Sequence, residues 1–121
     1  MKPLKIAMLS LTHGHTRKYF QTLAGSPKLD WVAACAAGEV VRQRFERAVR
    51  GVPCYDDEEE MFDRHPEIEA VVLASANREH LRQVEACARR GIHVLSMKIP
   101  TFDMAEYDRM IEAVDEAGVV C

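Results

Sequence analysis

The sequence lacks any apolar run near the roughly 20 residues that a membrane-spanning helix needs, and its first residues carry no signal-peptide pattern. Basic residues are not in excess, since 16 Lys and Arg stand against 19 Asp and Glu and the formal net charge is −3. No Cys-x-x-Cys pair occurs among its four cysteines. We therefore expect a cytoplasmic protein with reduced thiols that binds neither membranes nor nucleic acid.

A glycine-rich loop is also missing where the start of the chain would otherwise predict one. Residues 5–9 form an apolar run, a short polar turn follows, and an amphipathic segment comes next, which indicates strand, turn and helix. The free amide groups at the start of such a helix favour an anion such as a nucleotide phosphate. The three glycine positions of a G-x-G-x-x-G motif fall on Ser10, Thr12 and His15.

Two histidines flank Gly14, the one glycine of this turn. They could hydrogen-bond a phosphate, act as metal ligands, or simply cap or fill the turn. No acidic residue or cysteine lies nearby in the sequence, so we assign no metal. The candidate cofactor-binding residues of the turn are Ser10, Thr12, His13, Gly14 and His15.

Strands and helices are predicted to alternate along all 121 residues. Apolar runs bounded by glycine or proline predict strands, and apolar residues at three- and four-residue spacing predict helices. The expected strands are residues 5–9, 29–36, 52–55, 70–74, 92–96 and 119–121. Since no tight hairpin signal occurs, we predict one α/β domain over residues 1–121. It is a doubly wound parallel sheet of the Rossmann type, in three layers (α/β/α), with strand order 3-2-1-4-5-6.

Acidic residues begin two of the predicted helices. Asp56 and Glu59 have the spacing of a helix-start box, and Asp103 with Glu106 starts the final helix. We expect the buried face of that final helix to be its apolar stripe, Met104, Tyr107, Ile111 and Val114. The preceding helix, for which Asn77 is a natural cap, has the stripe Leu81, Val84, Cys87 and Ala88.

Four separated segments resemble one family in matching order: the first strand-turn-helix, residues 71–80, residues 91–98 and residues 103–118. Together they resemble the nucleotide-binding domain of the glucose-fructose oxidoreductase and inositol dehydrogenase family (Gfo/Idh/MocA). In that family the middle segments read roughly V-V-I-A-T-P-N-x-x-H and G-K-H-V-L-C-E-K-P. The residues that fall on matching positions are Asn77, His80, Gly91, His93, Val94, Leu95 and Lys98.

The resemblance implies an NAD- or NADP-binding domain of an oxidoreductase that transfers hydride between the nicotinamide and a sugar or polyol hydroxyl. It implies that Lys98 is catalytic, stabilising charge on the reacting oxygen or moving its proton; otherwise it is a surface lysine. It places Ser75 and Asn77 beside the nicotinamide ribose, at a strand end where open α/β sheets bind ligands. Asn77 could instead serve only as a helix cap.

Three departures from the family pattern favour an alternative, a non-catalytic binding or assembly module that keeps the fold and has lost the cofactor. The glycines of the first turn are gone, and the acid expected after the second strand is replaced by Ala36. The family's second domain, which supplies most of the substrate pocket, is not found in these 121 residues. The chain could also be the N-terminal part of a longer enzyme.

Cofactor choice and assembly can also be anticipated from these departures. With alanine at position 36, no carboxylate hydrogen-bonds the ribose hydroxyls of NAD, and none repels the 2′-phosphate of NADP. Arg42 on the next helix could reach that 2′-phosphate. Otherwise Arg42 is a solvated helix charge. Glu39 opens the same helix and could replace the missing acid. We expect no sugar or polyol turnover by this polypeptide alone, and self-association as a homo-oligomer through the apolar edge left by the last strand.

Overall fold

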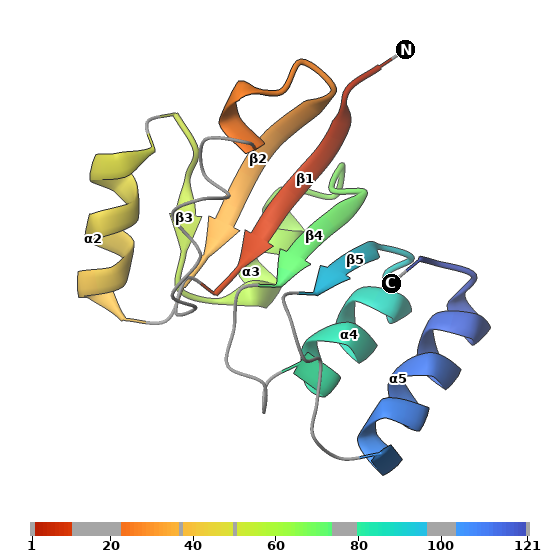
Figure 1. Cartoon of the computed structure of the whole chain (residues 1–121). Coiled ribbons are helices and arrows are strands. Elements are labelled where there is room, and N and C mark those ends of the chain that lie inside the picture. Colours follow the sequence, from red (N-terminus) through yellow and green to blue (C-terminus); the bar gives the residue numbers. More distant parts are fainter. Residues whose placement is uncertain are drawn as a thin grey trace.

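The described strands form one parallel sheet in the order β3-β2-β1-β4-β5 (Figure 1). The computed structural model describes residues 2–10, 23–36, 38–49, 51–73, 80–96 and 104–120. The strands are β1 (Leu4–Leu9), β2 (Leu29–Cys35), β3 (Cys54–Tyr55), β4 (Ala70–Leu73) and β5 (His93–Ser96). All four neighbouring pairs are parallel. This confirms the predicted doubly wound sheet and the order of its first five strands.

The central strand β1 is apolar along its length because both of its faces are buried. Ala7 and Leu9 belong to one core cluster, and Ile6 and Met8 belong to the cluster on the opposite face. None of these four side chains is more than 3% exposed. The uninterrupted apolar run at the start of the sequence therefore reflects a strand that contributes to two cores.

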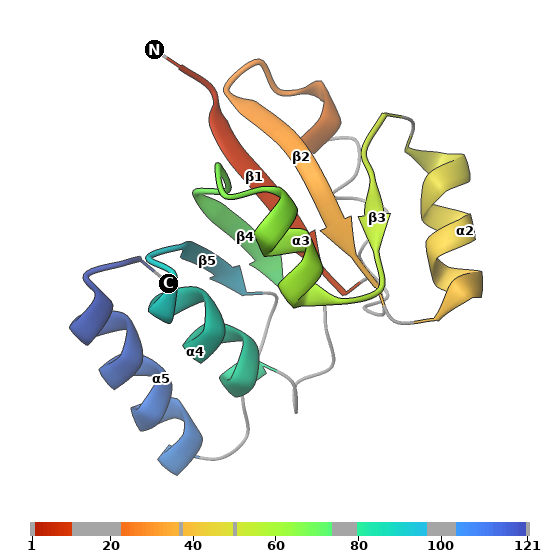
Figure 2. The ribbon, with the colours of Figure 1, turned by 180° about the vertical axis from the view of Figure 1, so that it is seen from behind.

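The helices cover both faces of the sheet, as predicted for a three-layer domain. The described helices are α2 (Glu39–Ala48), α3 (Glu58–Arg64), α4 (His80–Arg89) and α5 (Met104–Ala117). Residues of α3, α4 and α5 share one core cluster with β1, and α2 contributes to the other cluster. Figure 2 shows α3 in front of the sheet and α4 and α5 at its β5 end. On the opposite face Phe45 of α2 packs edge-on against Trp31, with ring centroids 5.4 Å apart.

The start of α3 lies one residue later than the helix-start box predicted. Asp57, not Asp56, is the N-cap residue, and its side chain accepts a hydrogen bond from the Glu59 backbone N–H at 3.3 Å. The three acidic residues that follow occupy the first turn, where the helix dipole favours negative charge. The acidic run therefore has a local structural role at a helix start.

The predicted buried stripe of α5 is wrong in phase. Met110 is the buried residue of this helix, at 4% exposed, and half-buried Val114 packs against the same core cluster. Met104, Tyr107 and Ile111 are 71%, 41% and 44% exposed. Figures 1 and 2 show why: α5 lies beside α4 at the β5 end of the sheet, so part of its apolar stripe has no strand beneath it.

The predicted sixth strand is not found within the described residues. Val119 and Val120 belong to no strand, and Cys121 lies outside the described residues. The Val94 backbone N–H nevertheless donates to the Val120 carbonyl at 2.8 Å. The chain after α5 thus returns to the outer edge of β5.

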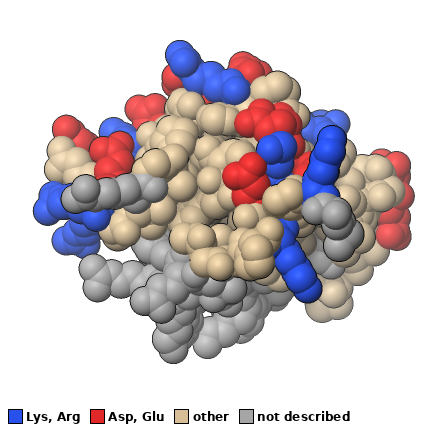
Figure 3. Space-filling view, turned by 90° about the horizontal axis from the view of Figure 1, so that it is seen from above, with Lys and Arg blue, Asp and Glu red and all other residues tan. Residues whose placement is uncertain are grey.

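Charges of both signs are interspersed on the face that Figure 3 shows. No described helix has the length and apolar character needed to cross a bilayer.

Cys35, Cys54 and Cys87 are free thiols, as predicted for these three cysteines.

Candidate functional site

The carboxyl ends of the parallel strands meet at one edge of the sheet, toward which all arrowheads in Figure 1 point. β1 has β2 on one side and β4 on the other, so the chain reverses its direction of progress across the sheet at β1. In open α/β sheets ligands bind outside the carboxyl ends of the strands at this switch point. Ser10 and Ala36, which follow β1 and β2, lie at this edge.

Ser10 has a left-handed backbone conformation, which glycine adopts most readily. Its φ angle is +60°, and it is the only described residue other than glycine with a positive φ. Its N–H donates to the Cys35 carbonyl at 2.7 Å, which continues the pairing of β1 with β2 before the chain turns away. The left-handed region is costly for residues with a Cβ. The residue predicted to occupy the first glycine position of the phosphate-binding motif therefore has a conformation that favours glycine.

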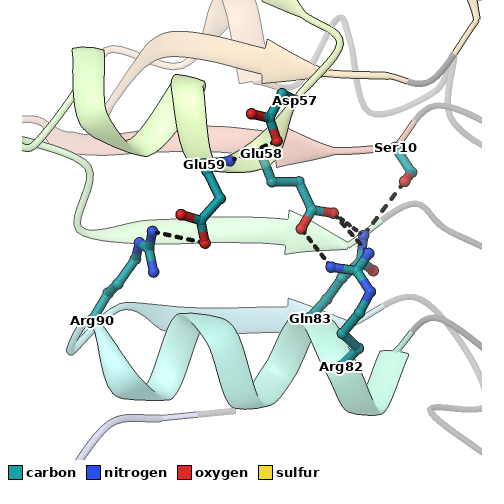
Figure 4. Close-up of polar contacts among 7 residues, drawn as sticks. All are labelled: Ser10, Asp57, Glu58, Glu59, Arg82, Gln83 and Arg90. Atoms are coloured by element: carbon teal, nitrogen blue, oxygen red, sulfur yellow. Dashed lines mark hydrogen bonds and ion pairs between the residues drawn. The ribbon is translucent and has the colours of Figure 1, made fainter.

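Ser10 is hydrogen-bonded to a buried glutamine from α4 (Figure 4). Gln83 Nε2 lies 3.5 Å from Ser10 Oγ and 2.8 Å from Glu58 Oε1. The Gln83 side chain is fully buried, and a buried amide of this kind requires hydrogen-bond partners. The contact links the end of β1 to the first turns of α3 and α4.

Glu58 is held in this network by an arginine as well. Arg82 Nη1 and Nη2 donate to the two Glu58 carboxylate oxygens at 2.8 Å and 3.1 Å. Burial raises the pKa of the Glu58 carboxyl, but the hydrogen bonds from Arg82 and Gln83 outweigh it, so the pKa lies below its ordinary value. Glu58 is therefore an ionised acceptor at neutral pH.

At the end of β2 the structure brings together Ala36 and Arg42. Arg42 Nη1 donates to the Ala36 carbonyl at 3.2 Å, so the guanidinium reaches back from α2 to the carboxyl edge of the sheet. The Ala36 side chain is 1% exposed and offers no polar group. Glu39 accepts a hydrogen bond from Gln43 one turn along α2, at 3.2 Å. The described groups at the end of β2 that could bind a ribose or its phosphate are thus the Arg42 guanidinium and the Glu39 carboxylate.

Most of the predicted site residues lie outside the described residues. These are Thr12, His13, Gly14, His15, Ser75, Asn77 and Lys98, and their assignments remain predictions. Of the predicted cofactor-binding residues, Ser10 and Arg42 are described, and both lie at the carboxyl edge of the sheet. Within the described ranges, no group of three or more His, Cys, Asp or Glu side chains could hold a metal ion.

Sequence reasoning missed Gln83 and Glu58. The available signal was a polar residue directly beside the predicted apolar stripe of α4, four residues before Cys87 in that stripe. Glu58 was assigned only to the acidic start of its helix. Its contacts are 24 and 25 residues away in sequence, so local spacing could not identify them.

Comparison with known proteins adds a family match over almost the whole chain. The family profile GFO_IDH_MocA, described as an oxidoreductase family with an NAD-binding Rossmann fold, matches residues 8–121. Myo-inositol 2-dehydrogenase from Thermotoga maritima is 35% identical over 66 residues, which are 54% of this chain and 20% of that protein.

Solved structures share the fold over the full chain. A dehydrogenase candidate from Bordetella bronchiseptica RB50 is 32% identical with a TM-score of 0.88, and the match covers 99% of this chain and 31% of that one. The WlbA dehydrogenase from Bordetella pertussis, solved in complex with NADH and UDP-GlcNAcA, is 23% identical with a TM-score of 0.88. That match covers 99% of this chain and 37% of the WlbA chain. The present chain therefore spans about a third of the length of these solved proteins.

Proposed function

Because the chain belongs to the Gfo/Idh/MocA oxidoreductase family and has its NAD-binding Rossmann fold, we propose that it binds a nicotinamide dinucleotide at the carboxyl edge of the sheet. The observation that carries this proposal is the left-handed turn at Ser10, directly after β1 at the switch point. In Rossmann domains the turn after the first strand carries the pyrophosphate-binding site. The residues proposed to contact it are Ser10, Thr12, His13, Gly14 and His15, with Ser75 and Asn77 on the nicotinamide side.

Within this proposal, NADP(H) binds at least as well as NAD(H). The support is the corner at the end of β2, where Arg42 reaches the Ala36 carbonyl and the Ala36 side chain has no carboxylate to repel a 2′-phosphate. An arginine retains four further N–H donors after one hydrogen bond. A charge-assisted contact to phosphate contributes about 1.5–3 kcal/mol, which corresponds to about tenfold or more in affinity.

Parallel calorimetric titrations of the 121-residue chain with NADPH and NADH test both parts of the proposal. Arg42→Ala should weaken NADPH binding about tenfold and leave NADH binding within about twofold. Arg44→Ala is the matched control, since Arg44 is an exposed arginine of the same helix, and it should change neither affinity. A clear preference for NADH would mean that Glu39 takes the place of the missing acid. If neither dinucleotide binds, the non-catalytic alternative replaces the proposal.

For the complete protein we propose an oxidoreductase that acts on a sugar or polyol hydroxyl. Two similar proteins support this class: one is named a myo-inositol dehydrogenase, and the other was solved with a nucleotide sugar. The nicotinamide supplies hydride transfer when it is bound. We propose that the Lys98 ammonium stabilises charge on the reacting oxygen or moves its proton, because a lysine pKa falls readily when the group is desolvated.

We also propose that the chain self-associates and is cytoplasmic. Leu95 of β5 and Val120 after α5 are 59% and 68% exposed, and Met104, Tyr107 and Ile111 of α5 are exposed as well. Exposed apolar side chains at a sheet edge favour contact with a second copy. The free thiols of Cys35, Cys54 and Cys87 support a reducing compartment.

A further inference from the structure

The end of β1 raises a question about how a serine is kept in a glycine conformation. Glycine adopts a positive φ without steric cost, whereas a residue with a Cβ requires surrounding contacts to hold it there. Among the described residues Ser10 has two such contacts: its N–H donates to the Cys35 carbonyl, and its hydroxyl oxygen accepts a hydrogen bond from Gln83. Of these two contacts between described residues, the second depends on a side chain, and that side chain comes from α4.

The orientation of the Gln83 amide is set by its other partner. The Glu58 carboxylate can only accept hydrogen bonds, so the amide nitrogen of Gln83 must face it. The same nitrogen carries a second proton, and Figure 4 shows Ser10 on that side, 3.5 Å away. Arg82 fixes Glu58 through two hydrogen bonds. Four side chains from β1, α3 and α4 thus form one connected chain that ends at the turn.

We propose that Gln83 is a positioning residue for the dinucleotide, because its amide holds Ser10 in the left-handed conformation and so sets the direction in which the chain leaves β1. The inference rests on the proposed function and assigns α4 a role in cofactor binding through Ser10. Glu58 and Arg82 support this role by orienting Gln83. Substitution of Gln83 should therefore change cofactor affinity as long as residue 10 has a Cβ to restrain.

The test is a double-mutant cycle on the full 121-residue chain, with NADPH and NADH affinities measured by calorimetry. Gln83→Met keeps the length of the side chain and removes its hydrogen bonds, and it should weaken binding about tenfold. Ser10→Ala should do the same, because it keeps the Cβ and removes the hydroxyl. Ser10→Gly should bind about tenfold more tightly than Ser10→Ala, because both lack the hydroxyl and only alanine keeps the Cβ. Adding Gln83→Met to Ser10→Gly should cost nothing more.

A matched control is Glu85→Gln on the same helix, which removes the ion pair to Arg109 of α5 and should leave dinucleotide affinity unchanged. The inference is overturned if Gln83→Met weakens binding equally in the serine and glycine backgrounds, since the glutamine would then act only by packing. It is also overturned if Gln83→Met has no effect. If Gln83→Met does not fold, the contrast between Ser10→Ala and Ser10→Gly decides alone.

Failure of the proposed function gives a different pattern. In that case the wild-type chain itself binds neither dinucleotide, and the role of Gln83 in cofactor binding falls with it. Thermal unfolding of the same four proteins of the cycle still measures the contact between residues 83 and 10. A midpoint shift from Gln83→Met that is smaller in the Ser10→Gly background confirms the restraint, and equal shifts exclude it.

Discussion

Glu58 is the residue through which acid should loosen the network at the end of β1. Its pKa is lower in the folded chain than the ordinary 4.5, so its stabilising effect is complete above that value and is lost as the pH falls below it. We predict that the urea midpoint falls between about pH 5 and about pH 3, and falls less steeply in Glu58→Gln. Glu59→Gln is the control, because this carboxylate is 76% exposed and its pair with Arg90 is 3.5 Å long. An identical pH profile for wild type and Glu58→Gln would contradict the prediction.

Ser10 shows what residue-level reasoning can and cannot find. The motif spacing predicted that this residue occupies the first glycine position, and its φ angle is positive. A left-handed residue with a Cβ costs roughly 1–2 kcal/mol, and a neutral hydrogen bond contributes about 0.5–1.5 kcal/mol. One hydrogen bond from Gln83 can therefore offset most of the cost. That partner lies 73 residues away, so no local pattern could predict it.

Among the elements, α5 shows that the apolar periodicity of a helix does not by itself determine which side of the helix is buried. Apolar runs bounded by glycine or proline were enough to predict every described strand, because assigning a strand does not require a choice of its buried side. A helix must also be assigned a buried side, and that side depends on its neighbours. Met104, Tyr107 and Ile111 have the spacing of an apolar stripe, but these side chains are exposed and Met110 is buried in the core. The reason is that α5 packs on α4, beyond the edge strand.

Two methionines of α5 test this phase directly. We predict that Met110→Ala lowers the free energy of unfolding by about 2–5 kcal/mol, because it leaves a cavity in the core. Met104→Ala should change it by less than about 0.5 kcal/mol, since that side chain is 71% exposed. Urea denaturation of both variants gives the comparison. Equal losses would mean that the predicted stripe is buried in solution after all.

At the scale of the whole molecule, we expect dinucleotide binding without turnover from this polypeptide alone. Hydride transfer requires a substrate held against the nicotinamide in a near-attack geometry, and a single sheet edge leaves that position open to water. Absorbance at 340 nm with a panel of inositols and sugars is the measurement, with NADPH and NADH affinity measured in parallel. Steady production of reduced cofactor by the purified chain would refute the expectation.

Self-association is expected at the β5 end of the molecule. Light scattering at increasing concentration should give a mass above that of the monomer, 13.7 kDa. Ile111→Glu should shift the population toward monomer, because it places a charge in the exposed apolar stripe. Val40→Glu on α2 is the control, since this valine is 62% exposed at the other end of the sheet. A monomeric mass at every concentration would refute the proposed assembly.

The place of β1 in the sheet also governs how the chain is made. Of the five described strands, the first to leave the ribosome is the middle one, and its two neighbours pair with it at very different times. Leu4 pairs with Leu29, whereas Leu9 pairs with Leu73, so one edge of β1 stays unpaired until some sixty further residues have been synthesised. At about 5–20 residues per second this interval lasts for seconds. A nascent chain therefore carries an exposed apolar edge through much of its synthesis, and ribosome-associated chaperones should bind it most strongly before β4 emerges.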